Sequence, residues 1–203
     1  EKVVVKDDIA VEESDNTTGR RGVAGTVFVH KIAGAKAETG ANLEEVKRCA
    51  EKAVSNIRTF GFAFGPCIIP SVGKPGFSLA EDEMELGTGI HGEAGIRRMQ
   101  IPASRELADI LLARIQSDII LKEGDEIAVL VNGCGATPLM ELYILMQDVA
   151  KVLKAQHIKI YRSFVGNYMT SLEMAGGAVS VMKLDEELKE LLDARADTPA
   201  FHI

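Results

Sequence analysis

Apolar residues recur along this chain in two patterns, one with the spacing of a helix and one in short continuous runs. A period near 3.6 residues is typical of an amphipathic helix, whereas a continuous apolar run bounded by turn residues is typical of a buried strand. The first pattern predicts helices over 25–37, 42–57, 104–115, 137–153 and 185–194. The second predicts strands over 3–11, 62–70, 126–131, 158–165 and 178–184. The range 25–37 has a β-branched start compatible with a strand, but its alanine-rich end favours a helix.

Local signals place several helix starts. Asn42 is a good N-cap, and Glu45 three residues later completes the pattern of a capping box. Ser104 is expected to cap the third helix, and Thr137 followed by Pro138 is expected to start the fourth. The apolar faces should pack in the core, and they comprise Leu43, Val46, Ala50, Val54, Ile57; Leu107, Ile110, Leu111, Ile115; Leu139, Leu142, Tyr143, Met146, Val149 and Leu153.

Helices alternate with apolar strands over the whole chain, which predicts the α/β class, a layered sheet with helices on its faces. The length of 203 residues fits one large domain, so 1–203 is expected to form a single α/β domain. The chain opens almost at once on the strand-like run 2–5, without a capped beginning or a leader, as a piece of a longer protein would.

Composition and charge narrow the possible partners and location. A formal net charge of −7 disfavours nucleic acid and anionic membranes, because both require a basic surface. No apolar run approaches the roughly 20 residues needed to span a bilayer, and no signal peptide is evident. The three cysteines are odd in number and widely spaced, which argues against a disulfide framework. We therefore expect a soluble cytoplasmic protein.

The candidate chemistry centres on the stretch 87–95, GTGIHGEAG, where His91 lies among four glycines directly after the acidic run 81–85. Glycine lets the backbone approach a ligand closely, so a histidine in such a loop is presented to a partner. As a metal ligand, His91-Gly92-Glu93 matches the start of the zinc deaminase signature, but the Pro-Cys-x-x-Cys that must follow is missing, so no metal site is expected. The roles of general base and nucleophile remain open, with Glu93 placed to orient the ring.

Other chemically interesting residues have simpler interpretations. The sequence 133–138, GCGATP, is more typical of a tight β–α turn than of an anion cradle, because it lacks the P-loop and dinucleotide spacings. Cys134 has no histidine partner that the sequence can name, although a hydrolase using this thiol remains an alternative. Arg20 and Arg21 fit either phosphate binding or surface ion pairs. The acidic run 81–85 is expected to form a solvated face. Packing is expected for His30, Met169, Leu172 and Met174, and exposure for His157 and His202.

Four motifs stand together in a specific order: 18–26 (TGRRGVAGT), 77–95 (FSL through GIHGEAG), 135–143 (GATPLMELY) and 170–176 (TSLEMAG). In this order, from residue 3 to residue 201, the chain resembles the C-terminal half of the substrate-binding subunit of dihydroxyacetone kinases, the DhaK family. The resemblance implies the second α/β domain of a two-domain subunit, with the N-terminal half absent.

In the family, the histidine of Gly-Ile-His-Gly-Glu adds to the carbonyl carbon of dihydroxyacetone and holds it as a hemiaminal. The resemblance assigns this catalytic role to His91 and implies that Gly89, Gly92 and Glu93 line the substrate site. It also implies a homodimer and a nucleotide-binding kinase subunit as partners. ATP or ADP with magnesium is then expected on that partner, with no cofactor on this chain. Alone, the chain is not expected to turn over, because the acid–base pair of the family lies in the N-terminal half.

A function of another class also fits the resemblance, that of a non-catalytic paralogue that senses dihydroxyacetone and acts as a transcriptional coactivator. The sequence does not separate the enzyme from the sensor. It also does not choose between ATP and a phosphotransferase relay as the phosphate donor, define which other short ketoses or aldehydes bind, or tell design from proteolysis as the origin of a missing half.

Overall fold

The computed structural model describes residues 1–11, 19–91 and 93–203 and confirms the α/β class. The helices are α1 (Thr26–Glu38), α2 (Leu43–Asn56), α3 (Ser104–Gln116), α4 (Leu139–Ala155) and α5 (Glu186–Asp193). The strands are β1 (Ile57–Ala63), β2 (Glu83–Leu86), β3 (Arg97–Gln100), β4 (Glu126–Gly133), β5 (Lys159–Gly166) and β6 (Gly176–Lys183). The strands form one sheet in the order β3-β2-β1-β6-β4-β5, in which β4 and β5 pair in parallel and the other neighbours pair antiparallel.

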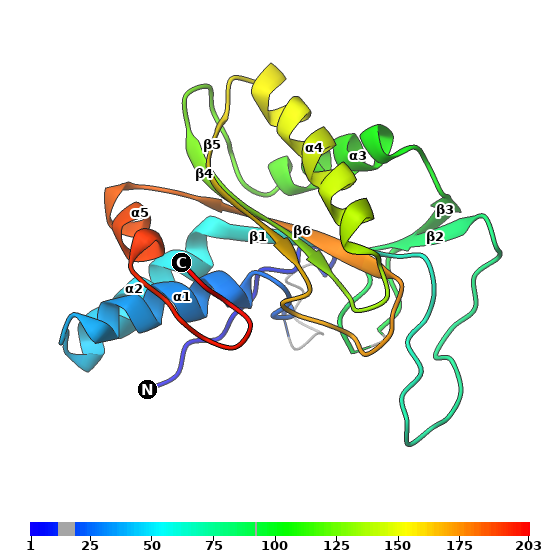
Figure 1. The fold of residues 1–203 in the computed structure, drawn as a ribbon, viewed down its shortest axis with the longest axis horizontal. Coiled ribbons are helices and arrows are strands. Elements are labelled where there is room, and N and C mark those ends of the chain that lie inside the picture. Colours follow the sequence, from blue (N-terminus) through cyan, green and yellow to red (C-terminus); the bar gives the residue numbers. More distant parts are fainter. Residues whose placement is uncertain (12–18, 92) are drawn as a thin grey trace.

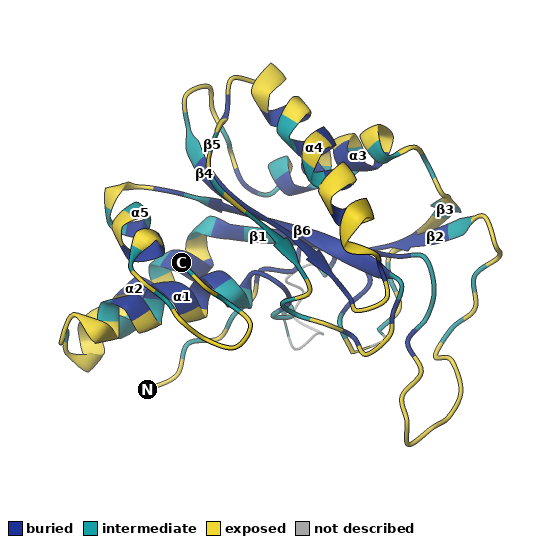
Figure 2. Cartoon of the chain, in the orientation of Figure 1, coloured by how far each residue is buried: buried dark blue, intermediate teal, exposed yellow. Residues whose placement is uncertain are grey.

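Helices cover both faces of this sheet, with α3 and α4 on one face and α1, α2 and α5 on the other (Figure 1). Alternation along the strands divides the buried side chains between the two layers. In β4, Val129 and Val131 pack under α3 and α4, whereas Ala128 and Leu130 face the opposite layer. The helices are buried toward the sheet and exposed on their outer sides (Figure 2). The continuous apolar run at 126–131 is therefore a strand buried on both faces, as predicted.

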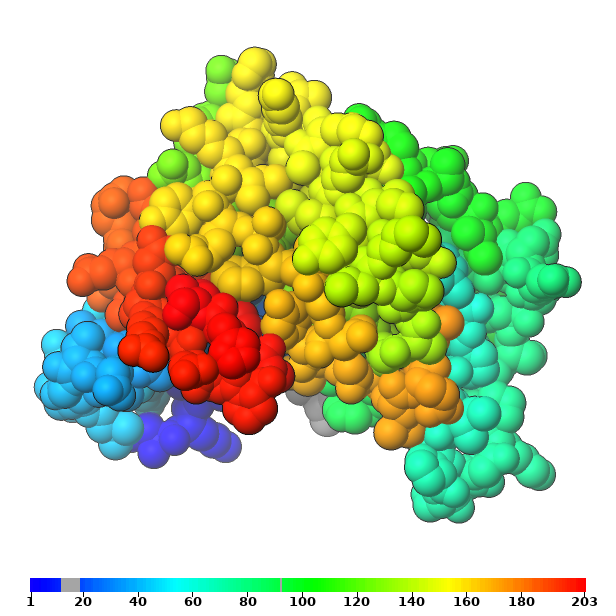
Figure 3. All heavy atoms as spheres, viewed as in Figure 1, coloured from blue at the N-terminus to red at the C-terminus, as the bar shows by residue number. Residues whose placement is uncertain are grey.

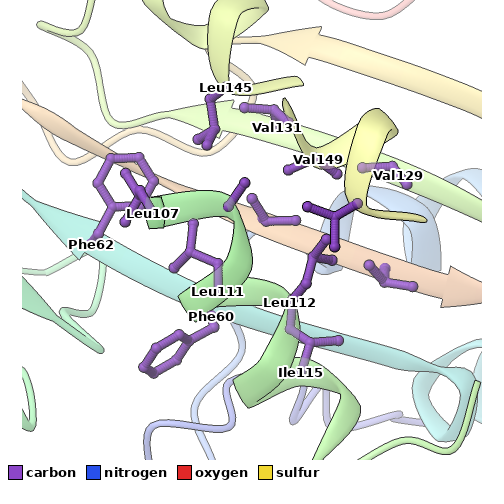
Figure 4. Close-up of a cluster of buried hydrophobic side chains, with 14 of the residues drawn as sticks. Phe60, Phe62, Leu107, Leu111, Leu112, Ile115, Val129, Val131, Leu145 and Val149 are labelled. Atoms are coloured by element: carbon purple, nitrogen blue, oxygen red, sulfur yellow. The ribbon is translucent and has the colours of Figure 1, made fainter. Parts of the chain in front are cut away.

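The larger core cluster fills the space between the sheet and α3 and α4. Phe60 and Phe62 from β1 meet Leu107, Leu111 and other apolar side chains of α3, and residues of α4 close the layer from above (Figure 4). The predicted stripe of α3 is thus confirmed, with Ile110 only partly buried. Removing a Leu from such a cluster costs roughly 2–5 kcal/mol, so this layer fixes β1 firmly.

Helix α2 begins as its sequence predicts. The Asn42 side chain accepts the Glu45 backbone N–H at 3.0 Å, and the Glu45 carboxylate accepts the Asn42 N–H at 3.2 Å, forming the expected capping box. The chain then passes directly from α2 into β1, with Ile57 as the first strand residue. The prediction of a strand over 62–70 is therefore wrong in its bounds. The strand begins earlier than predicted because β-branched and aromatic residues in 57–62 favour a strand there. It ends earlier because Pro66 has no backbone N–H to donate to a neighbouring strand.

The predicted strand over 3–11 is wrong within the described residues 1–11, where Asp8 makes only an isolated parallel bridge to Thr59 of β1. Side chains rather than a ladder tie this segment down. The buried Asp7 carboxylate accepts the backbone N–H groups of Val23 at 2.9 Å and Gly25 at 2.8 Å. These bonds fix the entry of α1, where a Cβ on Gly25 would lie 2.5 Å from an Asp7 oxygen.

The start of α4 corrects two further predictions. The N-cap is Pro138, and the Thr137 hydroxyl instead donates to the Gly176 carbonyl at 2.7 Å and accepts the Gly176 N–H at 2.8 Å. Leu139 and Tyr143 were expected in the core but are exposed, whereas Leu145 and Val152 are buried. The face of α4 that packs on the sheet is therefore turned about the helix axis from the predicted face. It consists of Leu142, Leu145, Val149 and Val152, which are spaced three and four residues apart.

Smaller corrections concern single residues. Ser104 is the first residue of α3, whose N-cap is Ala103 without a side-chain bond. His30 lies exposed on α1, and Leu172 is also exposed, contrary to the packing expected for them. Glu85 in the acidic run is buried in β2 rather than solvated, because Gly95 packs against its side chain and its carboxylate lies 3.5 Å from Arg98 of β3. The connection between β1 and β2, residues 64–82, protrudes from the body of the molecule (Figure 3).

Candidate functional site

The histidine loop connects β2 to β3 and is held at both of its ends. The Gly87 N–H donates to the Gly61 carbonyl of β1 at 2.7 Å, and the Ile96 N–H donates to the Leu86 carbonyl at 2.8 Å. Gly87 has a φ of +77°, and a Cβ there would lie 2.8 Å from the Ala10 Cβ. Glycine at 87 therefore satisfies both the left-handed backbone and the close approach of residue 10.

Within this loop, His91 is presented at the surface, with its side chain 79% exposed. The Glu93 carboxylate folds back beneath it: one oxygen accepts the His91 backbone N–H at 2.8 Å, and the other lies 3.5 Å from the imidazole Nδ1. A Cβ on Gly89 would lie 2.3 Å from that first Glu93 oxygen, so Gly89 leaves the room that the carboxylate occupies. Gly92, the remaining predicted site residue, lies outside the described residues.

The charge of Glu93 is stabilised where it lies. Partial burial by itself raises its pKa, but hydrogen bonds from the Glu93 and His91 backbone N–H groups and the charges of Arg21 and His91 outweigh burial and lower it. Glu93 is therefore ionised at neutral pH beside the imidazole. Because Nδ1 faces the carboxylate, the other ring nitrogen, Nε2, is the one directed away from it.

Arg21 connects this loop to the segment before α1. Its Nε donates to the Asp8 carboxylate at 2.7 Å, and its Nη2 donates to the Gly87 carbonyl at 2.9 Å. Asp8 is almost completely buried, with its side chain 2% exposed, and also accepts the Ala10 N–H at 2.9 Å. The structure thus brings two residues to the candidate site, Arg21 and Asp8, for which the sequence had given no such role.

The neighbouring Arg20 belongs to a different cluster. Its guanidinium pairs with Asp118 at the end of α3, and Arg58 of β1 pairs with the same carboxylate. These two arginines hold the pKa of Asp118 well below its usual range, against the opposing effect of burial. Both arginines of the 20–21 pair thus make ion pairs, one of the two roles that the sequence allowed.

Thr88 is a third residue near the site for which the sequence had indicated no role. Its side chain is buried, and within residues 1–11, 19–91 and 93–203 its hydroxyl has no hydrogen-bond partner. Its carbonyl oxygen packs directly over Gly61, where an added Cβ would lie 2.6 Å away. The loop is therefore packed on β1 at Thr88 as well as hydrogen-bonded to it at Gly87.

The turn 133–138 connects β4 to α4, as predicted. Its N–H groups are used within the fold: Cys134 donates to Gly176 at 3.1 Å and Ala136 donates to Met174 at 3.2 Å. Gly135 has a φ of +126° and passes so close to the Leu172 carbonyl that a side chain has no space. These bonds occupy the donors that an anion cradle would need.

Burial raises the pKa of the Cys134 thiol to about 12, with a further contribution from the nearby Cys67. A thiol that is neutral at physiological pH is a poor nucleophile. The environment of Cys134 therefore argues against the hydrolase alternative.

Among the residues that the structure describes, no group of three or more His, Cys, Asp or Glu side chains is arranged to hold a metal ion. A cavity of about 640 Å³ lies between α1 and the segment 195–201, and its lining includes none of the residues 87–93. None of the described helices is both long enough and apolar enough to cross a membrane.

The fold and the loop define a class: an α/β domain that presents a histidine on a glycine-rich loop at the end of its sheet. The sequence matches the Dak1 domain family over residues 1–200, and the chain belongs to this family.

Relatives and solved structures agree with this assignment. The chain is 54% identical over 202 residues to the dihydroxyacetone-binding subunit DhaK of the PTS-dependent dihydroxyacetone kinase 1 of Listeria innocua, an alignment covering 99% of this chain and 61% of that protein. Among solved structures, the dihydroxyacetone kinase operon co-activator Dha-DhaQ matches with a TM-score of 0.87 and 35% identity, over 95% of this chain and 60% of that one. The dihydroxyacetone kinase of C. freundii with AMP-PNP and Mg²⁺ matches with a TM-score of 0.76 and 29% identity, over 93% and 34%. The chain thus spans about 61% of its Listeria relative's length.

Proposed function

We propose that this chain is the dihydroxyacetone-binding part of a dihydroxyacetone kinase, and that His91 captures the substrate covalently. Membership of the Dak1 family and 54% identity to a dihydroxyacetone-binding subunit support the substrate. The observation that carries the mechanism is the exposed His91 imidazole with an ionised carboxylate beside its Nδ1. His202 is also exposed with a carboxylate, that of Asp197, beside its Nδ1, so the place of His91 on the glycine-rich loop of the family motif is what singles it out.

The capture step balances without any further reagent. The Nε2 lone pair of neutral His91 attacks the carbonyl carbon of the ketone, a C–N bond forms, and the carbonyl π electrons move to oxygen. The ring now carries a positive charge, which is neutralised when Nδ1 gives up its proton to Glu93. The new alkoxide takes a proton from a water molecule, and Glu93 passes its own proton to the hydroxide that remains, which restores the carboxylate and the water. The product is a neutral hemiaminal that contains one intact dihydroxyacetone. Glu93 acts here as the base that a histidine nucleophile needs.

Covalent capture also explains selectivity. Glycerol differs from dihydroxyacetone by a hydroxyl in place of the carbonyl and keeps both terminal hydroxyls, so contacts to those hydroxyls do not separate the two. Because glycerol has no carbon that the imidazole can attack, His91 would retain the ketone and release the polyol. Selectivity would come from bond formation rather than from the shape of the pocket.

Phosphoryl transfer would require a second component. The C. freundii kinase that matches this fold was solved with AMP-PNP and Mg²⁺, and this chain aligns with only 34% of it. We propose that the nucleotide and its magnesium are bound by a partner subunit or domain, that residues 1–203 form one substrate domain, and that the subunit pairs as a homodimer.

A second candidate function is a dihydroxyacetone sensor that activates transcription. The observation that favours it is the similarity to the co-activator Dha-DhaQ, with a TM-score of 0.87. The His91 anchor would serve in either case. The two functions separate when a nucleotide-binding kinase subunit and a phosphate donor are added: the enzyme then forms dihydroxyacetone phosphate, whereas the sensor retains the unmodified ketone.

Native mass spectrometry with dihydroxyacetone tests the anchor. The chain should gain the mass of one intact dihydroxyacetone, and glycerol should give no gain. His91→Ala should abolish the gain, whereas His157→Ala, which removes another exposed histidine, should preserve it. The same measurement on the full-length subunit controls for a pocket that needs the rest of the polypeptide. Absence of the adduct in both forms, or an adduct that persists in His91→Ala, would refute the proposal.

A further inference from the structure

We infer that Arg21 is a positioning residue for the histidine loop: anchored on buried Asp8, its guanidinium holds the loop at Gly87 and Gly89 so that Glu93 stays beside His91. This inference rests on the function proposed above, because it explains how the capturing imidazole is kept ready. These six residues come from three separate parts of the chain, namely residue 8, residue 21 and the loop residues 87–93.

The anchor is firm because Asp8 is tied to the centre of the sheet. Its backbone bridges Thr59 of β1, and its N–H donates to the Arg21 carbonyl at 3.2 Å. Its carboxylate is 2% exposed and receives both Nε and Nη2 of Arg21, each at 2.7 Å. An ion pair with a buried carboxylate loses little to solvent screening, so Arg21 has one fixed orientation.

From this anchor the guanidinium reaches the loop on two sides. Nη2 donates to the Gly87 carbonyl at 2.9 Å, at the point where the loop leaves β2. Nη1 lies beside Gly89, only 2.8 Å from where a Cβ of that glycine would be, and the nearest other neighbour of that position is the Glu93 carboxylate at 2.3 Å. Arg21 and Glu93, with opposite charges, therefore both border the space that a side chain at residue 89 would fill, and the charge of Arg21 helps to lower the pKa of Glu93.

The planar fork of arginine suits this geometry, because its nitrogens can point to Asp8, Gly87 and Gly89 at once. A lysine ammonium is a single donor group on a flexible side chain, so it cannot contact all three of these residues at once. Arg21→Lys should therefore keep the charge next to Asp8 but hold the loop less well. When a loop visits its competent conformation for only a fraction of the time, the apparent affinity falls by that fraction.

The test uses three variants, each measured for dihydroxyacetone capture and for the exchange of the His91 amide hydrogen. Asp8→Asn/Arg21→Met removes the tether without leaving a buried charge unpaired. Arg21→Lys is the conservative variant, and it keeps a cation beside Asp8 should the double variant not fold. Arg20→Met is the matched control, since it removes the adjacent arginine, of similar exposure, whose guanidinium pairs with Asp118 rather than with Asp8.

In the double variant we expect the apparent dissociation constant of the adduct to rise about tenfold or more, as for a loop competent about one tenth of the time. The His91 amide, which donates to Glu93 at 2.8 Å, should exchange faster relative to the core amide of Val129. Arg21→Lys should be intermediate and Arg20→Met unchanged. A merely structural role would change the exchange of His91 and Val129 together.

Two failures are distinguishable. Capture and His91 exchange that stay at the parent level in both Arg21 variants would overturn the positioning role while leaving the proposed function intact. If neither this chain nor the full-length subunit forms an adduct, the proposed function is overturned, and the relative exchange of the His91 amide still decides whether Arg21 holds the loop.

Discussion

The histidine loop packs closely on the inner strand β1 at Gly61, and replacing this residue by alanine tests how the loop is supported. Gly61 lies in β1, where an alanine is ordinarily tolerated as well as a glycine or better. Here a Cβ would lie 2.6 Å from the Thr88 carbonyl oxygen, where ordinary contact begins at 3.4 Å. The two groups must separate by about 0.8 Å, the difference between these distances. Neither partner is a flexible side chain, so the backbone has to move.

The displacement falls on the hydrogen bond from the Gly87 N–H to the Gly61 carbonyl, which is 2.7 Å long. Overpacking of this kind costs about 1–3 kcal/mol. For a domain of this size each kcal/mol corresponds to about 2–4 °C in the melting midpoint, so Gly61→Ala should lower it by roughly 2–12 °C. Because the loop is pushed off its support, capture of dihydroxyacetone should also weaken, by about tenfold if the competent loop is populated one tenth of the time.

Gly65→Ala is the matched control, because Gly65 follows the same strand but has its nearest neighbour, the Ala175 Cβ, 4.0 Å away. With that space, alanine should leave stability unchanged or raise it by up to about 1 kcal/mol. Thermal unfolding by circular dichroism and native mass spectrometry of the adduct measure both effects. Equal midpoints and equal capture for the two variants would refute the idea that Gly61 supports the loop by close packing.

Three further outcomes are expected. Arg20 and Arg58 hold the pKa of Asp118 below its usual value, so this pair stabilises the fold above about pH 4 and the contribution is lost as the pH falls toward the folded-state pKa. Asp118→Asn should lower the urea midpoint at pH 7 by an amount equivalent to roughly 1–3 kcal/mol and flatten its decline in acid; a parallel decline in both proteins would contradict this sign. Burial and the raised pKa of about 12 should make Cys134 resist iodoacetamide at pH 7.5 until urea unfolds the chain, and rapid native alkylation would speak against it. Asn42→Ala removes the cap of α2 and should cost about 0.5–2 kcal/mol in urea unfolding, whereas a loss below 0.3 kcal/mol, read as about the error of such data, would show that the cap is not used in solution.

Much of the fold follows from local patterns in the sequence. The capping box at Asn42, the doubly buried strand 126–131 and the helix after Pro138 are each specified by neighbouring residues, and the structure contains all three elements. The errors arise where distant contacts decide. The 3–11 segment has the apolar residues of a strand, yet its two carboxylates bind backbone groups of residues 10, 23 and 25 and leave only a single bridge to the sheet.

The site was predicted unevenly for the same reason. The glycines around His91 predict a loop, and the i, i+2 spacing of Glu93 allows its carboxylate to reach the ring. Arg21 is 66 residues from Gly87 in the chain, so no spacing rule connects them. A weak signal was present in Asp7-Asp8, because two carboxylates within an apolar run must find donors if that run is buried.

The pairing of β1 with β6 has a consequence for the order in which the chain can acquire its structure. The two strands meet along seven residue pairs, from Ile57 opposite Met182 to Ala63 opposite Gly176, so contacts more than 110 residues apart build the middle of the sheet. Such non-local pairings form slowly, because the entropy cost of closing a long loop comes before the favourable contacts between the strands can form. Gly61, which supports the histidine loop, therefore reaches its final place only after residues 176–183 have been made. During synthesis His91 would leave the ribosome long before it could bind anything, and a nascent chain halted before β6 should be inert toward the ketone.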